Sequence, residues 1–168
     1  AQVMGIKTIV SEPAPAALPL IDKLCEEYDI KVAIHNHPKP SLYWDYKKLL
    51  EATKGVSARI GSCSDTGHWT RSGISPLEAI TALCDAKRVV SLHFKDLNEF
   101  GNPEAHDVAW GDGKSEAKAV LGELYKTGFK GMFAIEYEYN WENSVPDIAV
   151  CVANFEKMAQ ELVAAGKK

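Results

Sequence analysis

The sequence predicts an α/β fold built on a parallel sheet that curls as a (β/α)₈-type barrel. Short apolar, β-branched runs alternate with segments of helical periodicity along the chain, a pattern typical of βα units with parallel strands. Most of these runs end in His, Asp or Glu. Barrel enzymes place their catalytic groups at that end of several strands, whereas an open doubly wound sheet gathers its ligands at one switch point. The spread over several strands therefore favours the barrel.

The expected strands and helices follow one another in strict alternation. The third helix has the clearest start, with Ser75 as N-cap, Pro76 at the first helical position and Glu78 placed for a capping box. Gly128 is expected to end the fourth helix in a left-handed conformation. The strands are expected at Ile6–Val10, Lys31–His35, Ala58–Cys63, Arg88–His93 and Met132–Glu136, and the helices at Ile21–Tyr28, Ser41–Gly55, from Ser75 onwards, Ser115–Gly128 and Ile148–Leu162.

Composition narrows the class of protein. The 168 residues are 46% hydrophobic and 25% charged, which is enough for a single domain over residues 1–168 with its own core. A net charge of −4 without a basic patch argues against nucleic acid as a partner. The apolar runs are too short for a membrane span. Four widely spaced cysteines are expected to be reduced, and we expect a cytoplasmic protein, with the periplasm or secretion as alternatives.

Polar side chains gather at the ends of four expected strands. His35, Asn36 and His37 close the second strand, and residues two apart on a strand share a face, so the two histidines can point the same way. Asp65 closes the third strand and is followed by His68 and Trp69.

The last two strands repeat this arrangement. His93 and Lys95 alternate onto one face, as do Glu136 and Glu138. A lysine facing a barrel interior is costly unless paired, and an inward carboxylate needs a cation or a proton. Asp65, His93 and Glu136 together offer oxygen and nitrogen ligands without a thiolate, a set that suits Mn²⁺, Co²⁺, Zn²⁺ or Fe²⁺.

Four motifs resemble, in order and spacing, those of the xylose isomerase-like sugar phosphate isomerases and epimerases, a TIM-barrel family. The resemblance extends from residue 6 to the last helix and implies strands four to eight of the barrel, so the barrel is expected to be incomplete. Its two open edges would be covered by a homo-oligomer or by the missing N-terminal part. The motifs are Ser64–His68, Leu92–Asp96, the loop Trp110–Gly113 and Ala134–Glu138.

The resemblance also implies how a metal is held. The family's ligands ending strands six, seven and eight correspond to Asp65, His93 and Glu136, and manganese or zinc is favoured. His35 stands where the family has a glutamate, so we expect it either as the fourth ligand or as a base. In the family's epimerases two metal-bound glutamates exchange a proton beside a ketone, and here only Glu136 remains of that pair.

The expected activity is isomerisation or epimerisation of a sugar or sugar phosphate through an enediolate. Glu136 is expected to act as the base, with His35, His37 and Lys95 as further catalytic groups. A dehydratase or lyase acting on keto-sugars would use the same enolate, and a non-catalytic sugar-binding barrel is a further alternative. An apurinic-site endonuclease would need more ligands and a less acidic protein. The residues expected to bind the substrate are Asn36, His68, Trp69, Trp110 and Glu138.

Overall fold

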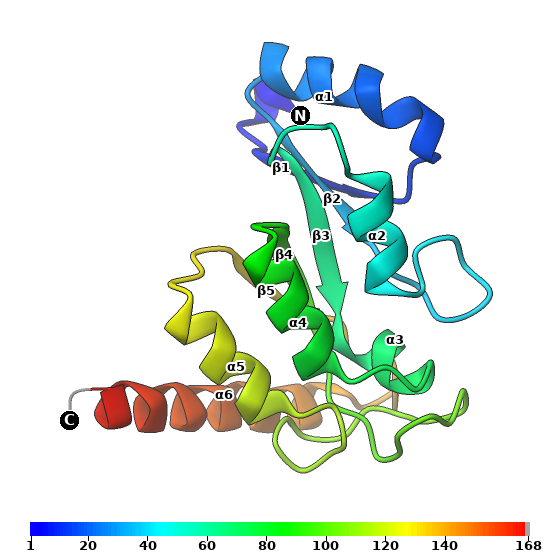
Figure 1. Cartoon of the computed structure of the whole chain (residues 1–168). Coiled ribbons are helices and arrows are strands. Elements are labelled where there is room, and N and C mark those ends of the chain that lie inside the picture. The colour runs from blue at the N-terminus through cyan, green and yellow to red at the C-terminus, as the bar shows by residue number, and fades with distance from the viewer. Residues whose placement is uncertain (167–168) are drawn as a thin grey trace.

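The computed structural model describes residues 1–166 and contains one sheet of parallel strands curled into a half-barrel (Figure 1). The strands lie in sequence order, β1-β2-β3-β4-β5, as successive right-handed βα units require. This arrangement confirms the prediction of an incomplete (β/α)₈ barrel. The strands are β1 (Thr8–Ser11), β2 (Lys31–His35), β3 (Ile60–Asp65), β4 (Val89–Phe94) and β5 (Met132–Ile135).

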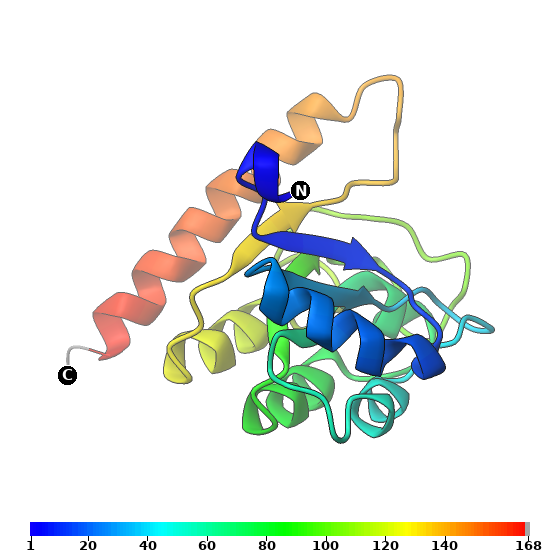
Figure 2. The same ribbon diagram turned by 90° about the horizontal axis from the view of Figure 1, so that it is seen from above.

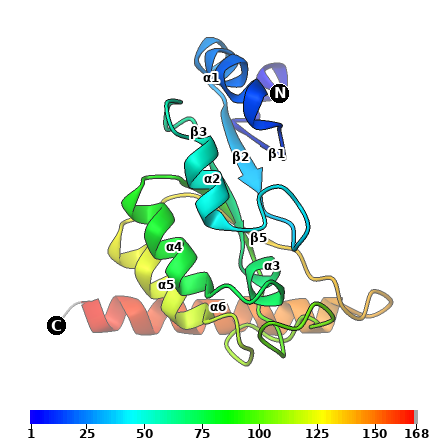
Figure 3. The same cartoon turned by 45° about the vertical axis from the view of Figure 1, so that its right-hand side comes forward.

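Helices cover one face of this sheet. Figures 1 and 3 show α1, α2, α4 and α5 following one another along that face, and α6, the longest helix, continues the layer beside α5. The view from above in Figure 2 shows the same layering. Among these helices, none is both long and apolar enough to cross a membrane. The helices are α1 (Leu18–Glu27), α2 (Tyr46–Ala52), α3 (Thr66–Arg71), α4 (Pro76–Asp85), α5 (Ala117–Lys126) and α6 (Val145–Gly166), with 3-10 turns η1 (Gln2–Met4) and η2 (Pro15–Ala17).

Local capping explains where the helices begin. The Ser75 side chain accepts the Glu78 N–H at 3.2 Å, as the sequence predicted for α4. The expected start of the second helix near Ser41 is wrong, because the Asp45 side chain accepts the Lys47 N–H at 2.9 Å and α2 begins only at Tyr46. The short helix α3 was not predicted. It follows β3 directly, and Asp65, which ends the strand, also caps the helix.

The hydrophobic core lies between the sheet and the helices. Ile34, Ile60 and Leu92 point into it and are completely buried. Because side chains alternate along a strand, the residues between them point to the opposite face. The strand register then places Asp65 beside His93 and His93 beside Ala134. The polar residues predicted at the strand ends therefore share the face that the helices do not cover.

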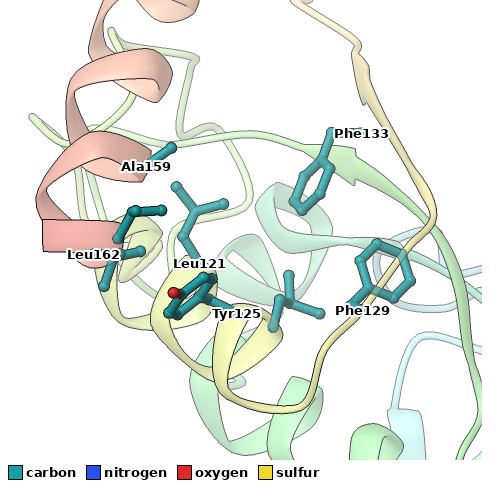
Figure 4. Close-up of a pocket in the computed structure, with 8 residues that line it drawn as sticks. Leu121, Tyr125, Phe129, Phe133, Ala159 and Leu162 are labelled. Atoms are coloured by element: carbon teal, nitrogen blue, oxygen red, sulfur yellow. The ribbon is translucent and has the colours of Figure 1, made fainter. Parts of the chain in front are cut away.

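An apolar cavity remains in the outer layer between α5, β5 and α6 (Figure 4). It is lined by Leu121, Tyr125, Phe129, Phe133 and Leu162, among others. Phe129 lies in the loop before β5 and Phe133 is near the start of that strand, so this cavity lies toward the opposite end of the sheet from the strand ends that carry the polar cluster.

Arg88, just before β4, ties the loop between α2 and β3 to the sheet. Its guanidinium donates hydrogen bonds to the carbonyls of Thr53, Val56, Ser57 and Ile60 at 2.6–3.0 Å. One guanidinium thus serves four backbone carbonyls at once, and hydrogen bonds from a charged donor are among the strong ones.

Arg88→Leu should lower the free energy of unfolding by roughly 2–4 kcal/mol, because several half-buried carbonyls lose a charged donor at once. Urea denaturation measures the change. Arg59→Leu is the matched control: Arg59 pairs with exposed Asp29, and exposed ion pairs contribute little. Equal losses in both variants would contradict this role of Arg88.

Candidate active site

Asp65 lies at the centre of the polar cluster, and its position is fixed from two sides. Its Oδ1 atom accepts the backbone N–H of His68 at 2.7 Å and so caps α3. The Asn36 side chain donates to the Asp65 carbonyl at 2.9 Å and accepts the Asp65 N–H at 2.8 Å. With the backbone and Oδ1 held in this way, only Oδ2 faces the other polar residues.

Four basic nitrogen atoms surround the second oxygen of Asp65. Asp65 Oδ2 is completely buried and forms an ion pair with Lys95, but within residues 1–166 it accepts no hydrogen bond, and His35 Nε2 has no hydrogen-bond partner either. Burial alone would raise the pKa of Asp65, but His35, His68 and Lys95 beside it hold that pKa well below its usual range. The distances to Oδ2 are 3.2 Å from Lys95 Nζ, 3.5 Å from His35 Nε2, 3.6 Å from His68 Nε2 and 4.0 Å from His93 Nδ1.

This donor set fits a divalent metal ion. Ligand atoms of His35, Asp65, His68 and Glu136 all lie within 4.8 Å of one another, and Glu136 Oε2 is 3.0 Å from His93 Nδ1. Buried polar atoms in a folded protein normally have partners. An ionised oxygen and an imidazole nitrogen that face each other without a hydrogen bond are therefore the arrangement expected around a cation. Imidazole and carboxylate ligands suit Zn²⁺, Mn²⁺ and related ions.

His68 belongs to this group by distance, but its protonation makes it a donor. Arg71 Nη1 lies 3.1 Å from His68 Nδ1, and a guanidinium has no acceptor atom. His68 Nδ1 must therefore accept this hydrogen bond. Burial lowers the pKa of His68 to about 4, so the ring is neutral at pH 7 and its single proton sits on Nε2. A protonated Nε2 can donate to a ligand in the site but cannot coordinate a metal.

Lys95 supplies the positive charge of the cluster. Its side chain is 1% exposed, and its Nζ lies 2.8 Å from Glu138 Oε2 and 2.9 Å from Glu136 Oε2. Burial opposes the ammonium form, but Asp65 and the two glutamates raise the pKa of Lys95 above its ordinary value. The lysine stem passes close to Gly67, where an added Cβ would lie 2.8 Å from Lys95 Cβ. A side chain at position 67 would thus displace Lys95.

The structure adds residues that the sequence analysis missed. Glu12, just after β1, has its Oε2 3.0 Å from His37 Nδ1, which in turn lies 3.4 Å from His35 Nδ1. A carboxylate shortly after a predicted strand was a signal that could have been used. Arg71 bonds Glu138 at 3.0 Å, and this contact spans too much sequence to be inferred from spacing.

Two predicted substrate-binding residues lie elsewhere. Trp69 is completely buried in the hydrophobic core. Trp110 packs edge-on against Phe94 with ring centroids 4.8 Å apart, on the side of the sheet that faces the helices. The structure therefore does not bring either indole to the polar cluster. Asn36, His68 and Glu138, the other predicted substrate-binding residues, do lie in it or directly beside it.

Asp107 supports the cluster from the loop between β4 and α5. It is 2% exposed, and its Oδ2 accepts the backbone N–H of Glu138 at 3.1 Å. Burial raises the pKa of Asp107 to about 6, although the Glu138 N–H, Lys95 and Arg71 partly offset this. The carboxyl thus holds the strand end that carries Glu138.

Comparison with known proteins places this arrangement in context. Residues 16–161 match the sequence model described as xylose isomerase-like TIM barrel. The chain is 28% identical over 158 residues to the rhizopine catabolism protein MocC of Rhizobium meliloti, which covers 83% of this chain and 46% of that protein. The chain thus spans about half the length of this curated relative.

Solved structures share the fold. A D-tagatose 3-epimerase-like protein has a TM-score of 0.82 at 20% identity, covering 98% of this chain and 66% of its own. The IOLI protein with a bound zinc atom has a TM-score of 0.70 at 18% identity. The match covers 98% of this chain and 65% of that protein. Mannonate dehydratase from Streptococcus suis has a TM-score of 0.75 at 15% identity. The match covers 92% of this chain and 49% of that protein.

Asp107→Asn should change how stability depends on pH. The folded pKa of about 6 exceeds the ordinary value of 3.8, so the folded wild type binds the extra proton and loses stability as the pH rises through this window. Relative to wild type, the free energy of unfolding of the variant should increase by roughly 2–3 kcal/mol between pH 4 and pH 7. Urea denaturation across this range measures it, with the exposed Asp112→Asn as control. A difference that does not vary with pH would contradict it.

Proposed function

The chain belongs to the xylose isomerase-like TIM barrel family, and on this premise we propose that it is a divalent-metal-dependent isomerase or epimerase of sugars or sugar phosphates. The observation that carries the proposal is the pair of buried atoms without hydrogen bonds, Asp65 Oδ2 and His35 Nε2. Glu136 and His93 lie close to them, with His93 Nδ1 4.0 Å from Asp65 Oδ2. Solved relatives whose names include an epimerase and a zinc-bound protein support this reading.

We propose Asp65, His93, Glu136 and His35 as the metal ligands. His68 is left out because the hydrogen bond from Arg71 keeps the proton on its Nε2 atom. Manganese and zinc are the preferred ions, and cobalt and iron would suit the same ligands. When bound, such an ion stabilises the negative charge that develops on the substrate's oxygens as a proton leaves the carbon beside a carbonyl.

The protein's own residues supply the proton transfers and hold the substrate. The Glu136 side chain is 40% exposed, so it can reach a substrate and take the proton from carbon, leaving an enediolate. His37 is 52% exposed and is oriented by Glu12, which suits it to return a proton. His68 and Lys95 direct N–H groups toward the centre of the site, where they can bind hydroxyl or phosphate oxygens.

Proton abstraction can be followed directly. The Mn²⁺-loaded protein, incubated in D₂O with a panel of ketohexoses and their 6-phosphates, should incorporate deuterium at the carbon beside the carbonyl. Glu136→Gln should slow this exchange by about a thousandfold because it removes the base. NMR measures the exchange. Glu142→Gln, on the exposed loop after β5, is the control and should exchange as wild type does. Exchange that survives in Glu136→Gln would exclude it as the base.

The ligand assignment predicts opposite outcomes for two neighbouring histidines. His93→Ala should lose the metal that copurifies with the protein or is added at neutral pH, whereas His68→Ala should retain it, since His68 acts as a donor. Elemental analysis after gel filtration measures the stoichiometry. A double variant, Asp65→Ala with His93→Ala, that keeps the wild-type stoichiometry would exclude the site. A wild type that binds no metal at all would favour a non-catalytic sugar-binding barrel.

A keto-sugar dehydratase is the second candidate, favoured by one observation. The Glu12–His37 pair lies beside His35. His35 itself stands at the position where the family's epimerases have their second glutamate. An imidazole oriented by a carboxylate is suited to protonate a leaving hydroxyl. Mass spectrometry of the product separates the two reactions, because dehydration removes the elements of water and epimerisation leaves the mass unchanged.

A further inference from the structure

Lys95 stands among the carboxylates that we propose to hold the metal. We infer that Lys95 is an internal counter-cation of the metal-free protein, and that a divalent ion must displace its ammonium group from Asp65 and Glu136 in order to bind. This inference rests on the proposed metal site and concerns how that site is kept intact and how tightly it binds.

The charges explain why a cation is needed there. The carboxylates of Asp65, Glu136 and Glu138 all lie within 3.2 Å of Lys95 Nζ. The Asp65 side chain is completely buried, and Lys95 is the nearest cationic side chain to its Oδ2 atom. Without a positive charge, three converging carboxylates would repel one another, and a buried charge without a partner strongly destabilises a fold. The Lys95 ammonium therefore provides the balance that a metal would otherwise provide.

Lys95 and a metal ion would compete for the same atoms. The ammonium approaches Asp65 Oδ2 and Glu136 Oε2, and these oxygens also face the imidazole of His93. A metal binds such oxygens at about 2.0–2.2 Å. An ammonium in contact with the same two oxygens would lie close to the ion, and the two positive charges would repel each other.

Glu138 gives the displaced ammonium a place to remain. It is 2.8 Å from Lys95 and is also paired with Arg71 at 3.0 Å, and it is not among the proposed ligands. The aliphatic part of Lys95 is confined against Gly67. A small movement of the Lys95 head group toward Glu138 would therefore release Asp65 and Glu136 while the ammonium keeps one carboxylate partner.

Lys95→Met tests the inference, because methionine keeps most of the side-chain volume and removes the charge. Metal-free protein prepared with EDTA is compared with wild type by thermal denaturation and by calorimetric titration with MnCl₂ at constant pH. The variant should unfold at a lower temperature without metal, bind Mn²⁺ about tenfold or more tightly, which is about 1.4 kcal/mol, and regain stability when Mn²⁺ is added. Lys54→Met, at an exposed pair with Glu51, should change neither quantity.

Two results would overturn the inference and are distinguishable from each other. If wild type binds Mn²⁺ and Lys95→Met binds it equally or more weakly, Lys95 does not compete and the metal site stands. If neither protein binds Mn²⁺ or Zn²⁺, the metal site falls and the competition falls with it. Should Lys95→Met fail to fold, the double variant Lys95→Met, Glu138→Gln removes one charge of each sign, and the same gain in Mn²⁺ affinity is expected.

Discussion

The carboxylate of Asp65 links the fold to the site because its two oxygens have different tasks. Oδ1 ends a strand and starts a helix by capping α3, while Oδ2 is left facing three histidines and a lysine. The turn from β3 into α3 also brings His68 and Arg71 to the cluster. A single residue therefore determines both the direction of the chain and the charge at the centre of the site. A substitution of Asp65 would affect the stability of the fold together with ion binding at the proposed site.

Much of the architecture could be predicted because it depends on local patterns. All five strands were expected within a few residues of where they lie, since β-branched runs with polar ends mark buried parallel strands. The helix α3 escaped prediction because its six residues contain no apolar period. Glu12 and Arg71 also escaped, because their partners lie far away in sequence. The strand-end residues could be named from sequence, but not the hydrogen bonds that set their protonation.

Trp110 illustrates why proximity to a motif does not fix a side chain's position. It follows the strand-end motif of β4 and was expected beside the substrate. The Asp96 carboxylate, however, accepts backbone N–H groups from Gly111, Gly113 and Ser115 at 2.8–3.0 Å. These bonds fold the loop back, and a Cβ at Gly113 would lie 2.3 Å from Asp96 Oδ1. Tertiary hydrogen bonding thus directs the indole into the core against Phe94 and away from the polar face.

The ion pairs of Lys95 have a consequence for how the protein is made. In many small metalloproteins the unfolded chain must capture its ion before it can fold, so folding and metal uptake are one event. Here the carboxylates already have a partner in the chain itself, which allows folding to be completed first. An ion at the proposed site would then bind to a cavity that is already folded, so the fit of each metal to that cavity would matter more than the relative supply of metals during synthesis.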